Sequence, residues 1–327
     1  MGIKYVVYGA GGIGGVIGAR LFQSGADVTL IARGEHGSIL QSRGLRLISP
    51  QADELVRIPT VLHPGELRGA EDALFLMCMK SQHTQEAMAD LARTFGARPL
   101  KLACVQNGVA NERLLKRAYR DVYATLVNLP ATFLVPGEVL THAEGCGGVL
   151  DTGCYPSGVD ETAETMVADL AAAGFSAYAD AAVMRLKYAK LLTNLLNVVQ
   201  AAAAPEVDTR DFARRVRREA LDVFAAAGID CAGRDEYRER IHPYMRMADI
   251  PGHARQAGSS WQSLARGTGN IETEYLNGEI VLLAAQAGLP APANAACVAV
   301  ARALVSGAVA PQSVGIEAFA ALEPGER

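Results

Sequence analysis

Three glycines near the start of the chain have the spacing of a dinucleotide-binding loop. Gly9, Gly11 and Gly14 form a G-x-G-x-x-G pattern between an apolar run and a helical stretch. The first glycine of such a pattern allows a tight turn, the second lets the backbone approach a pyrophosphate, and the third allows close helix–strand packing. This context predicts a dinucleotide site, the alternative being a glycine-rich turn without a ligand. The cofactor-binding residues of this loop would be Gly9, Ala10, Gly11, Gly12, Ile13 and Gly14.

Arg33 predicts which dinucleotide the loop binds. In NAD-preferring sites an Asp or Glu about 20 residues after the glycines accepts a hydrogen bond from the ribose 2′-hydroxyl. Here the second apolar run, VTLIA, ends at Arg33, and a fixed cation there would pair with a 2′-phosphate. Glu35 lies two residues further, in an expected loop. We therefore expect NADPH/NADP+, unless Arg33 only decorates a strand end.

A polar stripe with helical spacing lies in the other half of the chain. If residues 184–203 form one helix, Lys187, Lys190, Asn194 and Asn197 share one face, at i, i+3, i+7 and i+10. An otherwise apolar helix carries such a stripe where it faces a wet cleft or a polar partner. A lysine ammonium there could stabilise a developing oxyanion and donate its proton to it, which is the chemistry of ketone reduction. A plain surface stripe is the alternative.

Three further residues allow both a structural and a chemical interpretation. Ser260 would be the first residue of a helix capped by Ser259, where its hydroxyl would suit a carboxylate or simply help to start the helix. Glu272 opens another expected helix, where an acidic residue ordinarily complements the helix dipole. Lys80 follows an expected strand, the place where ligands gather in open α/β sheets, although a lysine there can also merely snorkel.

The elements that must position these residues change in character near residue 180. Before it, apolar runs typical of buried strands alternate with helical stretches, which indicates a parallel sheet with both faces covered. Beyond residue 184, Ala/Leu-rich helical patterns dominate. We therefore expect an α/β fold, with a doubly wound sheet domain over residues 1–180 and an all-helical domain over residues 181–327. The expected strands are Ile3–Tyr8, Val28–Ile31, Leu74–Met79 and Leu100–Val105, with an extra pair at 46–49 and 56–61, and the expected early helices are Ile13–Gln23 and Thr84–Phe95. The expected later helices are 184–203, 209–227, 234–247, 259–266, 271–287 and 292–305.

Composition argues against several other classes of protein. The 327 residues carry a net charge of −4, which gives no overall attraction to nucleic acid or to an anionic membrane. No signal peptide is evident, and no apolar run approaches the roughly 20 residues that span a bilayer. The six cysteines lack CxxC spacing and the six histidines are dispersed, so we expect neither disulfides nor a metal site. A cytoplasmic enzyme for a small molecule, monomeric or homodimeric, is the expectation.

The motifs together are more specific than the glycines alone. GAGGIGG, VTLIARGEH, CMKSQHT, VQNGVAN, KLLTNLLN and GSSWQSLARGTGNIETEYLNGEIV occur in that order over residues 1 to 305. In this the chain resembles the ketopantoate reductase family, which reduces 2-dehydropantoate to pantoate with NADPH, a step in pantothenate and coenzyme A biosynthesis. The resemblance implies a Rossmann domain joined to an all-helical domain, with the active site in the cleft between them.

The resemblance also implies roles for individual residues. Lys190 matches the catalytic lysine, and Asn194 completes its K-x-x-x-N pattern. Glu272 matches the active-site glutamate, which we assign to the substrate's hydroxyl and to holding the lysine's ammonium.

The remaining matches concern binding. Lys80 matches a lysine near cofactor and substrate, and Asn107 an asparagine beside the nicotinamide and the reacting carbon. Ser260 matches the substrate-binding serine, twelve residues before the active-site glutamate.

Three departures from the family pattern fall on the substrate side. Val198 stands where a second asparagine is common, and Asn197, one residue earlier, would substitute for it. Ala110 replaces a frequent glycine, and Leu264 replaces a usual aspartate. The sequence therefore leaves open a reductase of a different branched or hydroxylated 2-keto acid. A non-catalytic NADP(H)-binding regulator is less favoured, because binding alone needs neither Lys190 nor Glu272.

Overall fold

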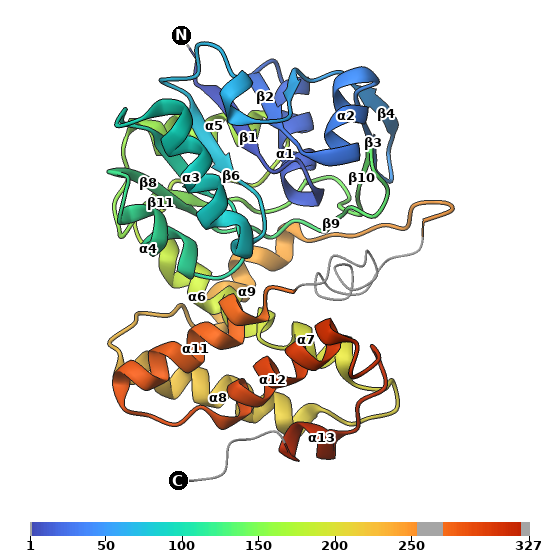
Figure 1. Ribbon diagram of the computed structural model, residues 1–327, viewed down its shortest axis with the longest axis vertical. Coiled ribbons are helices and arrows are strands. Elements are labelled where there is room, and N and C mark those ends of the chain that lie inside the picture. The colour runs from blue at the N-terminus through green and yellow to red at the C-terminus, as the bar shows by residue number, and fades with distance from the viewer. Residues whose placement is uncertain (1, 254–270, 322–327) are drawn as a thin grey trace. The chain divides into compact units, whose positions relative to one another are not determined.

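The computed structural model describes residues 2–253 and 271–321, which fall into two compact units (Figure 1). The sheet unit consists of Met1–Gln106, Asn111–Leu186 and Arg234–Arg255. The helical unit consists of Asn107–Ala110, Lys187–Gly233 and Gln256–Arg327. The division into domains at residue 180 stays a prediction. By their contacts, residues 107–110 group with the helical unit and residues 234–255 with the sheet unit.

A seven-stranded sheet forms the centre of the sheet unit. Its order is β11-β8-β7-β6-β1-β2-β5, and all neighbours are parallel except β11, which pairs antiparallel with β8. The four apolar runs expected as strands are confirmed as β1, β2, β6 and β7. The strands are β1 (Lys4–Tyr8), β2 (Asp27–Ile31), β5 (Thr60–Val61), β6 (Leu74–Met77), β7 (Lys101–Cys104), β8 (Asp121–Thr125) and β11 (Thr152–Cys154).

Helices cover both faces of this sheet. Along β1, Tyr5 and Val7 pack into one apolar cluster, which also holds buried residues of α1 and α5. Val6 and Tyr8 point to the other side, into a cluster with α3 and α4. Strands buried on both faces are apolar throughout rather than alternating, which is why these runs were recognisable in the sequence. The helices are α1 (Gly12–Gln23), α2 (Gly34–Ser42), α3 (Thr84–Phe95), α4 (Ala110–Lys116) and α5 (Glu161–Ala172).

The expected extra pair of strands belongs to a second, four-stranded sheet. Its order is β4-β3-β10-β9, where β3 (Leu45–Ile48) pairs antiparallel with β4 (Asp53–Val56) and parallel with β10 (Glu138–Thr141). The edge strand β9 (Ala131–Thr132) completes it. The run expected as a single strand over 56–61 is therefore wrong. Its first residue ends β4, and Thr60–Val61 joins the main sheet as β5.

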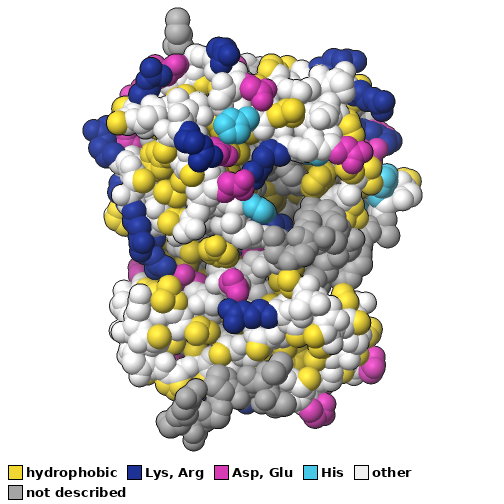
Figure 2. All heavy atoms as spheres, in the orientation of Figure 1, with side chains coloured by type: hydrophobic (Ala, Val, Ile, Leu, Met, Phe, Trp, Pro, Cys, Tyr) yellow, Lys and Arg dark blue, Asp and Glu magenta, His cyan; other side chains and the backbone are white. Residues whose placement is uncertain are grey.

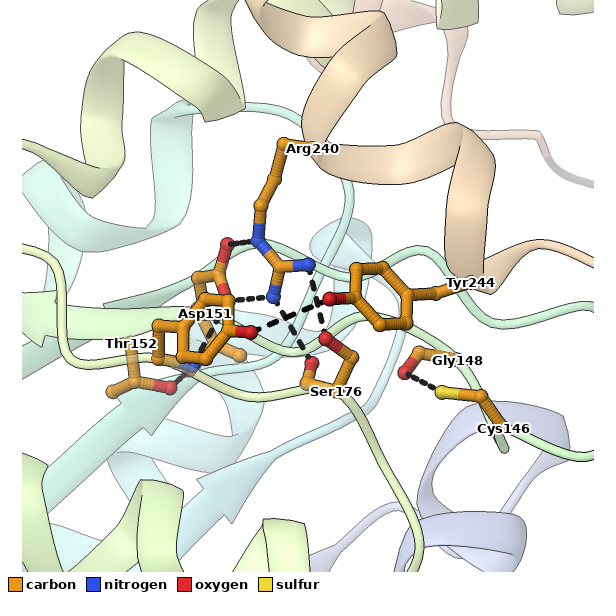
Figure 3. A network of polar contacts seen from close by, with 9 residues as sticks. Cys146, Gly148, Asp151, Thr152, Ser176, Arg240 and Tyr244 are labelled. Carbon is orange, nitrogen blue, oxygen red and sulfur yellow. Dashed lines mark hydrogen bonds and ion pairs between the residues drawn. The ribbon is translucent and has the colours of Figure 1, made fainter.

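An arginine–aspartate contact attaches the segment 234–255 to the sheet unit (Figure 3). Arg240 lies in α9 (Arg234–Ile241), and its Nε donates to Oδ2 of buried Asp151 at 2.7 Å. Its Nη1 donates to Ser176 Oγ at 3.0 Å. The guanidinium also lies 4.4 Å from the ring centroid of Tyr178 and 5.1 Å from that of Tyr244. We call these five residues the Arg240 cluster.

The helical unit consists of Ala/Leu-rich helices as expected, with one break. The expected helices over 209–227, 271–287 and 292–305 are confirmed to within two residues as α8 (Arg210–Ala226), α11 (Thr273–Ala287) and α12 (Pro292–Ser306). The expected helix over 184–203 is two helices, α6 (Val183–Asn194) and α7 (Asn197–Ala202). The helix expected over 234–247 is too long, because α9 ends at Ile241 and a short 3₁₀ helix, η3 (His242–Tyr244), follows it within the sheet unit. The helix expected over 259–266 lies outside the described residues, and α13 (Ile316–Ala321) ends the described chain.

The surface mixes charges of both signs. On the described residues of the face in Figure 2, basic and acidic side chains are interspersed. No helix in the described ranges is both long and apolar enough to cross a membrane. Within the same ranges, no group of three or more His, Cys, Asp or Glu side chains could hold a metal ion. All six cysteines are free thiols.

Candidate active site

The glycine loop connects β1 to α1 and fits the phosphates of a dinucleotide. Gly9 has a φ of +97°, and a Cβ there would lie 2.6 Å from the backbone nitrogen of Met79. A Cβ at Gly14 would lie 2.3 Å from the Gly9 carbonyl oxygen. Both positions therefore require glycine. At Gly11, the N-cap of α1, the nearest atom to such a Cβ is 3.8 Å away, so the space at the helix end is open. The N–H groups of the first helical turn point into that space and attract an anion.

Arg33 lies at the end of β2 and forms an ion pair. It is the N-cap of α2, and its Nη1 donates to Oε1 of Glu86 at 2.7 Å. This contact raises the pKa of Arg33 above its usual range. Glu86 stands in the first turn of α3, which the sequence predicted correctly, but the glutamate was not singled out. Glu35, expected in a loop, is in the first turn of α2 instead.

Lys80 lies next to a buried hydrogen-bond network. It follows β6 and is the N-cap of a short 3₁₀ helix, η2 (Ser81–His83). Asn111 donates to Ser81 Oγ at 3.0 Å and accepts from Thr84 Oγ1 at 2.8 Å. Gln106 donates to the same Thr84 oxygen at 2.9 Å. The loop after β6 and the loop after β7 are thus tied together at the carboxyl end of the sheet.

Asn107 lies in the second of these loops, in a stretch that packs with the helical unit. The next residue, Gly108, has a φ of +79°, and a Cβ on it would lie 3.0 Å from the Tyr275 carbonyl oxygen in α11. This close approach explains why residues 107–110 group with the helices. Asn107 therefore belongs to the same unit as Lys190 and Glu272.

Lys190 is a partly buried lysine on α6 with an altered proton affinity. The pKa of Lys190 is lowered to about 7, chiefly by burial and also by the nearby ammonium of Lys187, while the carboxylate of Glu272 opposes both effects. Lys187 is buried, and Glu272 has only 8% of its surface exposed. Glu272 is the N-cap of α11 rather than a residue of its first turn. A lysine that exchanges its proton near neutral pH can act as an acid and as a base.

The break between α6 and α7 corrects the expected stripe. Lys187, Lys190 and Asn194 do lie on one helix, but Leu195 and Leu196 form a turn before α7 begins at Asn197. The expectation that Asn197 follows Lys190 along one continuous helix is therefore wrong. The Leu195 carbonyl accepts a hydrogen bond from Asn277 Nδ2 of α11 at 3.1 Å, a partner that no helical periodicity reveals.

Two comparisons of sequence identify the family. The family described as ketopantoate reductase PanE/ApbA matches residues 5–157, and its C-terminal counterpart matches residues 179–305. This chain belongs to the ketopantoate reductase family. It is accordingly an oxidoreductase that acts on a CH–OH group with a nicotinamide dinucleotide. The Rossmann-type α/β fold with a helical C-terminal region is confirmed with it.

Individual relatives are distant but match over nearly the whole chain. The 2-dehydropantoate 2-reductase of Pyrococcus horikoshii is 26% identical over 302 residues, which cover 89% of this chain and 94% of the relative. That of Archaeoglobus fulgidus is 26% identical over 310 residues, which cover 92% and 97%.

Solved structures show the same fold. The PanE/ApbA family ketopantoate reductase of Ralstonia eutropha is 27% identical with a TM-score of 0.76, covering 93% of this chain and 99% of that one. D-mandelate dehydrogenase, solved with NADH and anilino(oxo)acetate, is 20% identical with a TM-score of 0.77 and the same coverage. At this identity the second likeness concerns the fold alone.

The expected ketopantoate reductase residues fall into three groups. The glycine loop, Arg33 and Lys80 belong to the sheet unit. The helical unit contains Asn107, Lys190, Asn194, Asn197 and Glu272. Ser260 and Leu264 lie outside the described residues. Of the departures, Ala110 begins α4, and Val198 is 1% exposed within α7 and so offers no polar or accessible surface to a ligand.

A buried amide network near Lys190 was not anticipated. Asn277 donates to Asn294 Oδ1 at 3.1 Å as well as to Leu195. Asn294 in turn donates to the Val216 carbonyl at 3.0 Å and to Glu219 Oε2 at 2.9 Å. The sequence signal was weak, since an asparagine inside an apolar helical pattern shows only that a polar partner must exist.

Proposed function

We propose that this chain reduces 2-dehydropantoate to pantoate with NADPH, as a step of pantothenate biosynthesis. The observation that carries the proposal is Lys190, a lysine whose pKa is lowered to about 7 beside a buried glutamate. A structural lysine needs no such environment, whereas a proton donor for a ketone does. Family membership supplies the reaction class, and the three polar helical-unit residues Asn107, Asn194 and Asn197 are the proposed substrate ligands together with Ser260.

The residues of this chain divide the chemistry between them. When bound, the dinucleotide supplies the hydride that the ketone carbon accepts. The ammonium of Lys190 stabilises the negative charge that develops on the ketone oxygen and then gives it a proton, so that the product is the secondary alcohol. Glu272 favours the charged form of Lys190 and would accept a hydrogen bond from the substrate's hydroxyl. In the reverse direction, neutral Lys190 takes the proton back.

The sheet unit supports the proposed cofactor. The first turn of α1 would hold the pyrophosphate, with Lys80 near the nicotinamide end. Arg33 would donate to the 2′-phosphate of NADP(H). Gly11 supports this approach, because the nearest atom to a Cβ placed there is 3.8 Å away and the helix end is open.

A second candidate substrate is another branched or aromatic 2-keto acid. The buried Val198 favours it, because the position where the family commonly has an asparagine cannot contribute a polar contact here. D-mandelate dehydrogenase, solved with NADH and anilino(oxo)acetate, shares this fold, so an aromatic 2-keto acid and NADH are included in the assays.

One set of kinetic assays tests the proposal. NADPH absorbance is followed with ketopantoate, 2-ketoisovalerate and benzoylformate, and each assay is repeated with NADH. We expect the highest kcat/KM for ketopantoate with NADPH. A clear preference for another acid would transfer the function to that acid, and tight NADPH binding without any turnover would make the chain a regulator.

The variant Lys190→Ala tests the mechanism within the same assays. Losing the proton donor should lower kcat by about 100-fold or more while leaving the Kd for NADPH nearly unchanged. Near-normal turnover of Lys190→Ala would remove the catalytic role of this residue. Arg218→Gln, which removes a positive charge from the exposed face of α8, is the control and should behave as the parent chain.

A further inference from the structure

The ion pair between Arg33 and Glu86 spans the end of the first strand of the main sheet. Arg33 follows β2 and Glu86 follows β6, and β1 lies between these two strands. The glycine loop begins where β1 ends, so both charged side chains reach the place where the adenosine end of a dinucleotide binds in this fold. The Arg33 and Glu86 side chains are 44% and 55% exposed, so a ligand can approach them.

The two partners recognise opposite forms of the ribose. A guanidinium donates to a 2′-phosphate, whereas a carboxylate accepts from a 2′-hydroxyl. A carboxylate next to a 2′-phosphate is also a like charge that competes for the same guanidinium, and here Glu86 already accepts from Nη1 at 2.7 Å. Because an exposed ion pair contributes little to stability, either ligand can rearrange it.

We propose that Glu86 is a cofactor-specificity residue, which weakens the preference for NADP(H) and allows NAD(H) to bind at the same site. This inference rests on the proposed dinucleotide site. The end of β2 lacks the acidic residue that accepts from the ribose 2′-hydroxyl in NAD-preferring sites, and Glu86 of α3 would supply it. His83, whose Nδ1 lies 3.9 Å from Glu86 Oε2, stands at the same corner.

Binding of NADP+ and NAD+, which differ only in the 2′-phosphate, tests the proposal without turnover. In Glu86→Gln the ratio of the NAD+ Kd to the NADP+ Kd, measured by isothermal titration calorimetry, should rise at least about fivefold. The ratio of kcat/KM for NADPH to kcat/KM for NADH should rise in parallel. Glu35→Gln is the matched control, because it removes the same charge two residues from Arg33, and its ratio should stay that of the parent.

The opposite results overturn the inference. If Glu86→Gln leaves the ratio unchanged, or weakens NADP+ binding, then Glu86 only orients Arg33. If Glu35→Gln produces the shift instead, the acidic partner is Glu35. A further variant, Arg33→Gln, separates this failure from that of the proposed function. It should weaken NADP+ binding at least about tenfold and spare NAD+, and if it spares both, the 2′-phosphate site itself is wrongly placed.

Discussion

Asn277 Nδ2 donates to the carbonyl oxygen of Leu195 at 3.1 Å, at the point where α6 ends and α7 has not yet begun. The contact joins two parts of the proposed catalytic machinery. α11 begins directly after Glu272, and α6 carries Lys190 one turn before its last residue. Asn277 is 1% exposed, so its removal leaves the Leu195 carbonyl without its buried donor. A buried amide thus joins the helix that carries Lys190 to the helix that begins after Glu272.

Replacing Asn277 by Leu should destabilise the protein and disturb catalysis. A buried carbonyl left without a donor costs about 1–3 kcal/mol, so the free energy of unfolding should fall by that amount. We also expect kcat to fall while the Kd for NADPH remains, because the glycine loop belongs to the other unit. Urea unfolding and steady-state kinetics measure both effects.

The control for this variant is Gln286→Ala, which removes an exposed amide from the same helix. It should alter neither quantity. The positioning role fails if Asn277→Leu is no less stable and no slower than this control.

The activity should depend on pH through Lys190, whose pKa is about 7. Ketone reduction needs the protonated amine, so kcat/KM for reduction should be highest below pH 7 and fall as the pH rises through 7. Oxidation of the alcohol needs the neutral amine, and its kcat/KM should rise over the same interval. If one acid–base group serves both reactions, kcat/KM for reduction falls and kcat/KM for oxidation rises over the same pH interval. Two profiles that change in the same direction would contradict this role of Lys190.

Lys190 also links stability to pH, with a sign that can be derived. Its pKa is about 7 when folded, against an ordinary value of 10.5, so between these values the folded chain binds fewer protons than the unfolded chain. The free energy of unfolding therefore rises with pH across that interval. Lys190→Met should lack this rise, and the difference between the two proteins should grow from pH 10 towards pH 7 in favour of the variant.

Lys187→Met should move the pH dependence of activity. Lys187 is buried one turn before Lys190, and its positive charge lowers the pKa of Lys190. Without that charge the pKa of Lys190 should rise, so the falling limb of ketone reduction should move to higher pH. At pH 8 the variant should therefore retain a larger fraction of its own maximal kcat/KM than the parent does. Arg218→Gln, a distant exposed charge on α8, should leave the limb in place.

Elements set by local pattern were predictable from the sequence, and those set by distant partners were not. Thr84–Phe95 was expected as a helix and forms α3 over the same residues. α2 was missed because its glycines have low helix propensity. Packing requires a glycine at position 37 of this helix, because a Cβ on Gly37 would lie 2.2 Å from the Ala32 carbonyl oxygen. Likewise β3 pairs with β10, some ninety residues later along the chain.

The same reasoning applies to the candidate site. Lys190 and Glu272 could be proposed from family motifs, and the structure places them in one unit with a charge interaction between them. Glu86 could not be connected to Arg33, because the two are 53 positions apart and only the strand order brings them together. Asn277, whose amide bonds to the Leu195 carbonyl at the helix break, lies 82 positions later and so was equally hidden.

The Arg240 cluster should contribute strongly to the stability of the sheet unit. The Arg240 and Asp151 side chains are 13% and 2% exposed, and Asp151 also accepts from the Tyr178 backbone N–H at 2.9 Å. Burial raises the pKa of Asp151, while Arg240 opposes that effect. Removing one charge from such a pair leaves the other buried, which costs about 3–5 kcal/mol. Asp151→Asn should therefore lower the free energy of unfolding by about that amount, measured by urea denaturation.

A second ion pair on the same helix provides the control for this variant. Glu236 of α9 accepts from Arg185 Nη1 at 2.6 Å, but the two side chains are 34% and 47% exposed. Because solvent screens exposed pairs, Glu236→Gln should cost only about 0–1 kcal/mol. Equal losses in Asp151→Asn and Glu236→Gln would show that burial of the Arg240 cluster does not hold the segment 234–255. A large loss in Asp151→Asn alone would show that one buried carboxylate attaches this segment to the rest of the sheet unit.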